Sequence, residues 1–336
     1  MATALAGITA ALPAGLRARV AASSDLERFV EFDNRYADPG HWISPAAARE
    51  FDRANPQPDR LAIIVESDGG TVAQGQAGDG GLWAPPDGTW RMTARVAPEW
   101  RRKRIGTAIV RELEEHARAR GARRLVTGIR GLEPEGLAFA RARGYREFHR
   151  RIDAYIDVAS FDPSRFDDPD TIAARAGVRL RSYQELARDH ADDLETLQRS
   201  LLGSFWEWYR DVPAPTPLAE EPPPFAQARR MFFEEPFNDP AATIVAIRGE
   251  SAVGVTATTV RENGVASTNF TGVARAERGK GIALALKLRA LEVLRRRKVR
   301  LFGTTNDEQN AAMRGINERL GYRPEPPTIM VEKLFR

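Results

Sequence analysis

Short apolar runs and helical spacings alternate along the first half of the chain. Runs at 61–65 and 71–75 flank a Gly-Gly turn and predict a pair of strands, and residues 89–96 predict a further strand. Residues 105–120 carry apolar side chains at helical spacing and end at a glycine, which predicts an amphipathic helix. The same criteria predict a strand at 124–127, a helix at 134–143 and a strand at 152–158.

The second half of the chain repeats this order of elements. Shifting the sequence by 177 residues aligns 96–146 with 273–323 without a gap, and 14 of the 51 aligned positions are identical. The predicted strands here are 243–247, 252–260, 265–273, 301–305 and 329–334, and the predicted helices are 282–297 and 310–320. A repeat of this length indicates one module used twice. Strands joined by crossover helices predict an α/β fold with a mixed, partly parallel sheet in each copy.

The repeat predicts the domain boundaries. We expect an N-terminal domain at 16–160 and a C-terminal domain at 177–336. The segment 161–176 is rich in Asp, Pro and Ser and is interpreted as a linker. Residues 1–15 are mostly small and apolar and lack a basic start, so we interpret them as an N-terminal lead-in rather than a signal peptide.

The composition is typical of a soluble globular protein and excludes several classes of function. Of the 336 residues, 42% are hydrophobic and 29% are charged, and no run of about 18 apolar residues predicts a membrane span. The absence of cysteine excludes disulfides, zinc-thiolate sites and cysteine nucleophiles, and fits a cytoplasmic location. The four histidines lack metal-binding spacing, so no metal is expected. Acids and bases interleave around a net charge of +4, which argues against a nucleic-acid partner.

One region interrupts the regular order of elements. Residues 203–240 hold eight prolines and eight aromatic residues, with seven acids against three bases. A long ordered loop in a compact domain is usually functional. Its negative charge predicts that it faces a cationic small molecule. The cluster of Trp206, Trp208 and Tyr209 has two interpretations, which stay open: it binds that molecule, or it forms a hydrophobic plug under the loop.

The strongest chemical motif lies between the predicted strand 265–273 and the long helix that follows. It reads Arg278-Gly279-Lys280-Gly281-Ile282-Ala283. Two glycines allow a sharp turn and a close approach of backbone to ligand. The free N–H groups of the first helical turn then favour a phosphate, and the side chains of Arg278 and Lys280 add positive charge. The motif is neither a Walker loop nor a nicotinamide fingerprint.

With this motif, the sequence resembles the GNAT acetyltransferase superfamily. The motif is similar to that family's acyl-CoA loop, and the later segment 305–322, which ends in Gly321-Tyr322, is similar to its cofactor-closing helix. The resemblance implies two tandem GNAT folds, an arrangement like that of mycothiol synthases. Each fold is expected to have a mixed, mostly antiparallel sheet with a splayed parallel strand pair and flanking helices.

The resemblance also implies direct acyl transfer from acetyl-CoA to an amine. The pyrophosphate is expected on the N–H groups of residues 279–283, and the pantetheine arm beside Val273 and Arg275, with the Asn310 side chain toward the cofactor. A backbone N–H near Val273 is expected to polarise the thioester carbonyl.

The residues that perform acid and base chemistry in many family members differ here. Where the family often has a tyrosine, four residues before the glycine of the Gly-aromatic pair, this chain has Asn317. The strand 265–273 holds no acid, and its nearest polar candidates are Asn269 and Thr271, with Glu262 just before the strand. Asn317, Asn269 and Glu262 are therefore the candidate catalytic residues. If none of these residues is the general base, we expect an acid of the region 203–240 or solvent to accept the proton.

The first copy differs from the second at the same positions. Its loop has Arg104 in place of Gly281, Glu133 in place of Asn310 and Ala140 in place of Asn317. Two interpretations follow. The first copy is a supporting domain with a degenerate cofactor loop, which we favour, or its row of basic residues makes a weaker or regulatory CoA site.

These observations predict an acetyl-CoA-dependent N-acetyltransferase whose C-terminal copy acts on a small, cationic primary amine. No nucleic-acid or membrane partner is expected, and the protein is expected to be a monomer or a homodimer. The alternatives are a protein or peptide N-acetyltransferase with an open groove and a non-catalytic sensor that binds acyl-CoA. The missing acid and base favour the sensor. Turnover of acetyl-CoA with a panel of amines distinguishes an enzyme from a sensor.

Overall fold

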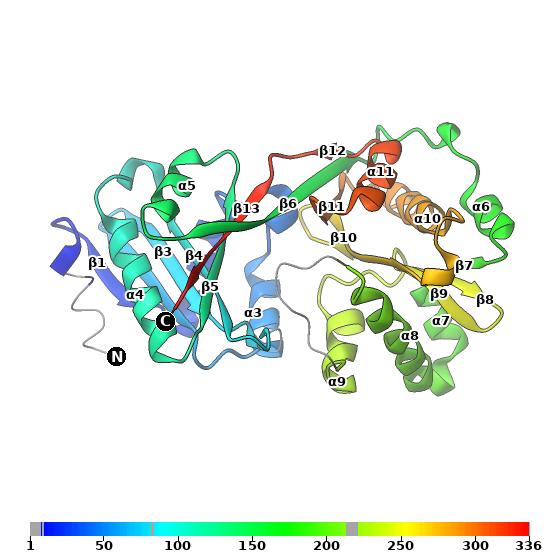
Figure 1. The fold of residues 1–336 in the computed structure, drawn as a ribbon, viewed down its shortest axis with the longest axis horizontal. Helices are drawn as coiled ribbons and strands as arrows, with labels where there is room; N and C mark the ends of the chain where they lie inside the picture. The colour runs from blue at the N-terminus through cyan, green and yellow to red at the C-terminus, as the bar shows by residue number, and fades with distance from the viewer. Residues whose placement is uncertain (1–7, 9, 82–83, 213–220, 336) are drawn as a thin grey trace. The chain divides into compact units, whose positions relative to one another are not determined.

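The chain folds into two compact units. The computed structural model describes residues 8, 10–81, 84–212 and 221–335 (Figure 1). Among these residues, the N-terminal unit contains the chain up to Arg150 and the segment from Thr328 onward, and the C-terminal unit contains Arg151 to Pro327. Most of the predicted lead-in at 1–15 lies outside the described residues. No helix of the described residues is long and apolar enough to cross a membrane.

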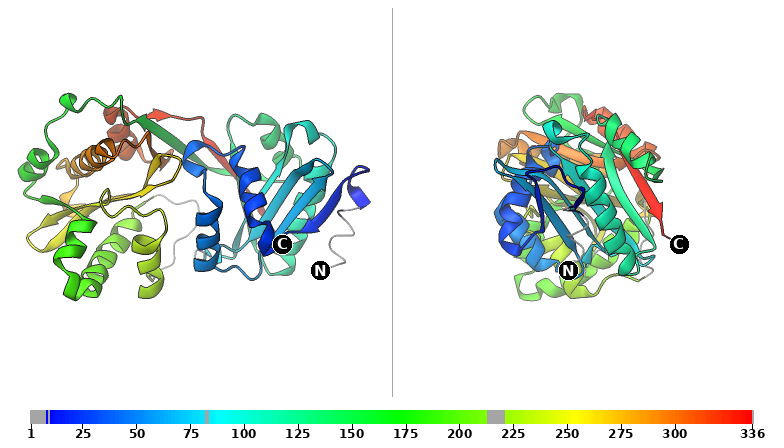
Figure 2. Two further views of the ribbon diagram at one scale, coloured as in Figure 1. Left: turned by 180° about the vertical axis from the view of Figure 1, so that it is seen from behind. Right: turned by 90° about the vertical axis from the view of Figure 1, so that its left-hand side faces the viewer.

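The N-terminal unit is built on a mixed sheet with strand order β1-β2-β3-β4-β5-β13. Its strands are β1 (Arg17–Val20), β2 (Leu61–Ser67), β3 (Gly70–Gly78), β4 (Thr89–Val96), β5 (Arg124–Arg130) and β13 (Thr328–Leu334). Its helices are α2 (Leu26–Asn34), α3 (Pro45–Ala54), α4 (Ile105–Ala119) and α5 (Pro134–Arg141), with short 3-10 turns at Ser23–Asp25, Pro39–His41 and Pro98–Trp100. Helices α2 and α3 lie on one face of the sheet and α4 on the other (Figure 2).

The C-terminal unit repeats this plan with strand order β6-β11-β10-β9-β8-β7, and β12 pairs with β6. Its strands are β6 (Arg146–Asp157), β7 (Arg179–Ser182), β8 (Ile244–Arg248), β9 (Ser251–Val260), β10 (Val265–Val273), β11 (Leu301–Asp307) and β12 (Arg323–Pro324). Its helices are α6 (Pro169–Arg175), α7 (Tyr183–Asp189), α8 (Leu194–Tyr209), α9 (Phe225–Arg229), α10 (Ile282–Arg296) and α11 (Ala311–Leu320). A π-helical turn spans Arg230–Glu234, and 3-10 turns lie at Pro163–Arg165, Ala191–Asp193 and Arg275–Glu277.

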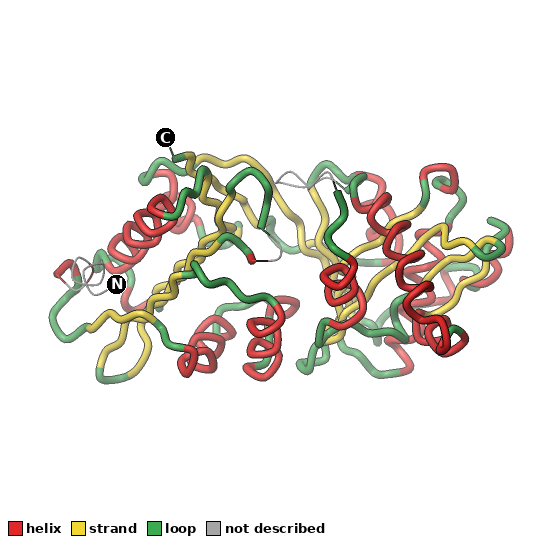
Figure 3. Tube along the Cα trace, turned by 90° about the horizontal axis from the view of Figure 1, so that it is seen from below, coloured by secondary structure: helices red, strands yellow, loops and turns green. Residues whose placement is uncertain are grey.

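Helices cover both faces of the sheet in the C-terminal unit (Figure 3). On one face, the apolar stripe of α10, with Leu284, Leu288 and Leu291, is buried in the larger core together with residues of α6 and α11. Gly254 of β9 allows this close packing, because a Cβ there would lie 3.2 Å from side-chain atoms of α10. On the other face, α7, α8 and the π-helical turn cover a separate core that includes Phe270 of β10.

The last strands of the two copies are exchanged between the units. The predicted boundaries, 16–160 and 177–336, place the final strand of each copy in the domain that the same copy forms. In the structure, each of these strands pairs within the other unit. β13 runs antiparallel to β5 in the N-terminal unit, and the second half of β6 runs antiparallel to β11 in the C-terminal unit (Figure 1). Both strands carry apolar residues in a pattern that suits either sheet, so the sequence does not distinguish the two pairings.

The segment 161–176, expected to be a linker, is instead folded onto the C-terminal unit. It contains α6, and Phe161, Ala173 and Ala176 are buried in the core beside α10. Its polar residues cap this helix, because the Asp168 side chain accepts hydrogen bonds from the N–H groups of Asp170 and Thr171. The Asp and Pro residues that suggested a linker are therefore partly explained as the residues that begin a helix.

The region 203–240 is mostly helical where it is described. α8 extends to Tyr209, and α9 and the π-helical turn follow residues 213–220, which lie outside the described residues. Phe205 and Trp208 are buried in the core with Phe270, and Phe232 and Phe233 pack against that core. Most of these aromatic side chains therefore form a hydrophobic plug, while Trp206 and Tyr209 are partly exposed.

Candidate functional site

The glycine-containing turn before α10 has the geometry that a phosphate requires. Gly279 and Gly281 adopt left-handed conformations with φ of +79° and +83°. Gly281 is the N-cap of α10, and no side chain caps this helix. The N–H groups of the first helical turn, which includes Ile282 and Ala283, are therefore available to an anion. The side chain of Ile282 points into the core and Ala283 packs against it, so these residues offer backbone only.

The basic side chains near this turn are already paired with acids. Arg275 and Arg278 both form ion pairs with Asp211, which follows α8, and Lys280 pairs with Glu277 at 3.0 Å. The hydrogen bonds from Arg275 and Arg278 hold the pKa of Asp211 well below its usual range. The Arg278 Nε also donates to the Val273 carbonyl at 3.0 Å. The basic side chains that were predicted to contact phosphate are thus held in ion pairs at the turn. The backbone N–H groups therefore remain as the principal anion-binding groups of the turn.

Next to this turn, the parallel strands β10 and β11 separate. They pair from Val265 with Leu301 as far as Thr268 with Thr304. Directly after Thr268, the pairing of β10 with β9 is shifted by a bulge, which leaves Asn269 without a register partner. A bulge re-aims the backbone and interrupts the ladder. It therefore presents the polar groups of residue 269 where the two strands open.

The side chains of the two polar candidates in β10 differ in their surroundings. Asn269 is exposed, and its Oδ1 accepts a long hydrogen bond of 3.5 Å from the Thr259 hydroxyl. Thr271 is occupied by a hydrogen bond of 2.9 Å with Thr256 on β9. Glu262 is exposed in the turn that follows β9. Of the three, Asn269 is the residue at the strand opening.

On the α8 side of the sheet, polar groups from several elements surround the strand opening. Tyr155 of β6 lies directly over Gly303 of β11, where a Cβ would come within 2.6 Å of its ring and 3.4 Å of the Ser267 hydroxyl. The segment after the π-helical turn approaches the same region, because the Val260 N–H donates to the Phe237 carbonyl at 2.8 Å. The Arg261 guanidinium lies 4.7 Å from the centre of the Phe237 ring.

Glu235 belongs to this segment and has a strongly shifted pKa. Burial raises the pKa of Glu235 to about 7, and the nearby charge of Arg261 lowers it only in part. Burial in turn lowers the pKa of Arg261. A carboxyl group that titrates near neutrality is suited to accept a proton from an amine. The acidic character of 203–240 pointed to this region, but no sequence signal distinguishes Glu235 from its six neighbouring acids.

Three of those acids have structural partners. Asp211 pairs with Arg275 and Arg278, as described above. Asp239 is buried, pairs with Arg297 and accepts hydrogen bonds from the N–H groups of Ala241 and Ala242. Glu234 pairs with Arg229 at 2.9 Å. Asp211, Asp239 and Glu234 are therefore compensated by partners, and Glu235 is the acid of the region whose pKa burial raises to about 7.

On the opposite face of the sheet, a second polar cluster lies under the strand opening. Lys287 of α10 is completely buried, and its Nζ lies 3.5 Å from the Thr268 hydroxyl. Its Nζ also lies 5.1 Å from the ring centre of Tyr322 and 5.8 Å from that of Phe302. Burial lowers the pKa of Lys287 to about 7. The sequence reasoning missed Lys287, although a lysine in the apolar stripe of a helix is a visible signal.

Asn317 and Asn310 of the closing helix have different environments. Asn317 is 3% exposed, and within the described residues both polar atoms of its side chain are buried without a hydrogen-bond partner. Asn310 is the N-cap of α11, and its Oδ1 accepts the Met313 N–H at 3.2 Å. The Asn310 oxygen therefore stabilises the helix, which leaves only its amino group for a ligand.

The N-terminal unit has a similar turn but lacks several of these features. Arg102 and Arg104 take the left-handed conformations of the two glycines, with φ of 63° and 62°, at a cost of about 1–2 kcal/mol each. Strand β4 pairs with β3 without a bulge. Glu133 is paired with Arg130 at 2.8 Å. The repeat offset places Val110 where the other unit has Lys287.

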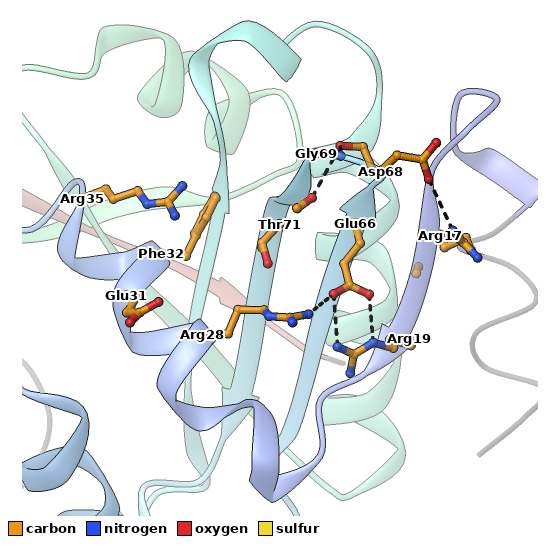
Figure 4. Close-up of a pocket in the computed structure, with 13 residues that line it drawn as sticks. Arg17, Arg19, Arg28, Glu31, Phe32, Arg35, Glu66, Asp68, Gly69 and Thr71 are labelled. Atoms are coloured by element: carbon orange, nitrogen blue, oxygen red, sulfur yellow. Dashed lines mark hydrogen bonds and ion pairs between the residues drawn. The ribbon is translucent and has the colours of Figure 1, made fainter.

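A cavity in the N-terminal unit lies away from this site. It has a volume of about 910 Å³ and lies between β1, α2 and the turn that joins β2 to β3 (Figure 4). Arg19 and Arg28 both contact Glu66 there, and Arg17 contacts Asp68 at 3.5 Å. Most charges in the cavity are therefore paired with one another, and none of the predicted site residues lines it.

Comparisons with known proteins agree with the repeat. The sequence model of the acetyltransferase (GNAT) family matches residues 27–145 and again 202–322. A GCN5-related N-acetyltransferase from Sphaerobacter thermophilus has a similar structure, with a TM-score of 0.71, 20% identity and 97% of each chain covered. A tandem GNAT protein from the clavulanic acid biosynthesis pathway is also similar, with a TM-score of 0.63 and 18% identity. This match covers 95% of this chain and 98% of that one. A search of curated proteins gives no match. At these identities the structural likeness shows the fold alone.

Proposed function

Because the chain belongs to the acetyltransferase (GNAT) family, we propose that its C-terminal unit transfers an acetyl group from acetyl-CoA to the primary amine of a small cationic molecule. The observation that carries this assignment is the bulge at Asn269, which lies where β10 and β11 separate and has no counterpart in β4. The uncapped glycine turn before α10 follows the same strand along the chain. Together they give one unit both an anion site and backbone polar groups at a strand opening.

Acetyl-CoA fits the groups that this unit offers. The N–H groups of Ile282 and Ala283 and the next residue are suited to the pyrophosphate, since no side chain takes them. The opening between β10 and β11 offers backbone groups near Val273 for the amides of the pantetheine arm. The thioester supplies an activated acyl group, and a backbone N–H at the Asn269 bulge is suited to stabilise the oxyanion that forms on its carbonyl.

Glu235 is the group we assign as the general base. In the reaction, the acceptor ammonium loses a proton to the Glu235 carboxylate, and the free amine nitrogen attacks the thioester carbon. The carbon–sulfur bond breaks, which gives the amide and CoA. A base with a pKa of about 7 is half ionised at neutral pH, where proton transfer from an amine is most effective. Direct transfer in a ternary complex requires no nucleophilic side chain.

The cationic acceptor is inferred from the same carboxylate. Ion pairing with a second positive group on the acceptor favours ionised Glu235, and Phe237 with the partly exposed Tyr155 offers aromatic surface beside it. The π-helical turn, whose Phe232 and Phe233 pack against the core on this face of the sheet, directly precedes Glu235. These features favour a small molecule over a protein chain.

The assignment is tested with a pair of reciprocal variants. Gly281→Arg copies the N-terminal loop into the C-terminal unit, and Arg104→Gly does the reverse. Gly281→Arg should raise the acetyl-CoA Kd measured by calorimetry at least tenfold, about 1.4 kcal/mol, and Arg104→Gly should leave it unchanged. If Gly281→Arg binds normally, the C-terminal unit is not the acetyl-CoA site. Release of free thiol with an amine panel then tests catalysis. Tight binding without turnover would favour the sensor.

A further inference from the structure

Lys287 is an ammonium group that the fold places in an apolar core, and no acid of the described residues pairs with it. Its side chain is completely buried, and its closest polar partner is the neutral hydroxyl of Thr268 at 3.5 Å. The rings of Tyr322 and Phe302 also lie close to its Nζ. Burying an unpaired ammonium is costly. A lysine at such a position therefore calls for a reason other than stability.

Thr268 connects Lys287 to the strand opening. Thr268 is the last residue of β10 that is paired with β11, and the bulge follows it directly. The Lys287 ammonium therefore lies beneath the point where the two parallel strands separate. It approaches that point from the α10 face of the sheet, opposite to the face that Glu235 and Tyr155 share.

Two further polar side chains are buried in the same region without partners. Both polar atoms of the Asn317 side chain and the Tyr322 hydroxyl lack hydrogen bonds within the described residues. The two residues adjoin, because the Tyr322 N–H donates to the Asn317 carbonyl at 3.0 Å. Leaving a buried polar group unsatisfied destabilises the folded protein. Two such side chains beside the buried Lys287 ammonium indicate a site that is completed by a polar occupant.

We propose that Lys287 is the general acid of the reaction and donates a proton to the sulfur of acetyl-CoA as the carbon–sulfur bond breaks. This inference rests on the proposed function. The acceptor nitrogen forms its bond to the carbonyl carbon, and the electron pair of the carbon–sulfur bond passes to sulfur. The Lys287 ammonium gives one proton to that sulfur, which yields CoA with a neutral thiol and a neutral lysine. The attacking nitrogen carries one extra proton after the bond to carbon has formed, and it releases this proton to solvent to give the neutral amide. Lys287 regains its proton from solvent when CoA leaves.

The electrostatics of the site suit this role. The pKa of Lys287 is lowered to about 7 by burial, so the group exchanges a proton readily near neutral pH. Tyr322 is the titratable group that faces it among the described residues, and burial raises the pKa of that hydroxyl well above its usual value, so Tyr322 stays neutral. Asn317 occupies the helix position of the acid that the resemblance implied, but an amide does not donate a proton to a thiolate. Lys287 provides that proton from α10 instead.

The first test observes Lys287 directly in the wild-type protein. The chain has five lysines, so a protein labelled with ¹³C at lysine Cε gives five resonances, and the Lys287→Met variant identifies one of them. The pH titration of that resonance is compared with saturating CoA and with desulfo-CoA, which lacks only the sulfur. A nearby thiolate favours the ammonium form, so CoA should raise the pKa of Lys287 by at least one unit more than desulfo-CoA does.

The outcomes of this test separate the two proposals. If both ligands bind but shift Lys287 equally, the lysine does not face the sulfur and the general-acid assignment is wrong. If neither ligand binds, or both perturb only Lys103 beside the N-terminal loop, the proposed function of the C-terminal unit is wrong and the inference fails with it. Lys280, which lies in the phosphate-binding turn, should respond to both ligands and serves as an internal control for binding.

A kinetic test uses the Lys287→Met variant, which keeps the length of the side chain without its charge. The kcat for acetyl transfer should fall at least tenfold, while the Kd of desulfo-CoA stays within twofold of wild type. A loss of kcat and binding together would indicate a structural role only. An unchanged kcat would overturn the proposal. If the variant does not fold, methionine variants of the four other lysines assign the Lys287 resonance by elimination, and the comparison of the two ligands on wild-type protein remains decisive.

Discussion

Replacing Lys287 by methionine should change how the stability of the protein depends on pH. In the unfolded chain a lysine side chain binds a proton up to about pH 10.5, whereas in the folded protein burial lowers the pKa of Lys287 to about 7. Between these values the unfolded state holds one more proton than the folded state. Stability therefore rises with pH across this window and falls as the pH drops toward 7.

The size of the effect follows from the two pKa values. Linkage gives a penalty from Lys287 of roughly 4 kcal/mol at pH 7.5 and roughly 1 kcal/mol at pH 9.5. The Lys287→Met variant has no ionisable side chain at this position, so this penalty is absent from its free energy of unfolding. The free energy of unfolding of the wild type, minus that of the variant, should therefore increase by roughly 2 to 3 kcal/mol between these two pH values. The difference removes the contribution of every other titrating group that both proteins share.

The assay is urea unfolding followed by circular dichroism at several pH values between 7.5 and 9.5. Lys298→Met is the matched control, because the side chain of Lys298 is exposed in the folded protein as well as in the unfolded chain. The difference in free energy of unfolding between the wild type and Lys298→Met should not change with pH. If the Lys287→Met difference were equally flat, the ammonium would be solvated in the folded protein, and the argument from burial would be refuted.

Three further changes test other parts of the structure. Asp211→Asn should free Arg275 and Arg278 from their ion pairs and lower the Kd of CoA severalfold at low ionic strength, with the gain lost at about 0.5 M salt, as calorimetry at two salt concentrations would show. Glu235→Gln should remove the limb of the kcat/KM profile that rises through about pH 7, and an intact limb would exclude this carboxylate as the base. Ending the chain at Pro327 removes β13 and should increase amide hydrogen exchange in β5 of the N-terminal unit more than in β9 of the other unit.

Much of the local structure could be predicted from the sequence because it depends on neighbouring residues. The strand at 265–273 was predicted with its observed ends, and α10 ends within one residue of the prediction. Apolar spacing and glycine position alone determine such elements. The mixed sheet, the repeated plan and the family were confirmed for the same reason, since each depends on the order of elements along the chain.

The parts that sequence reasoning missed depend on residues that are distant along the chain. Asp211 neutralises Arg278, which lies 67 positions away. Burial by several elements, rather than any local motif, shifts the pKa of Glu235 and of Lys287. The helix α6 was mistaken for a linker because its capping residues have the composition of a loop, and only its packing against α10 shows its role. The composition of a segment does not show which residues it packs against, and in α6 this packing determines the structure.

The exchanged strands give a physical reason why a first copy without the acetyl-CoA features is retained. β6 belongs to the first copy by sequence, yet it forms the outer neighbour of β11 in the C-terminal unit. It brings Tyr155 over Gly303 at the strand opening, and its Asp153 accepts a hydrogen bond from Thr305 of β11. A chain without the first copy would expose the edge of β11 and remove one wall of the proposed acceptor site. We therefore infer that the first copy contributes to the reaction through this strand, even where its own loop has lost the glycines.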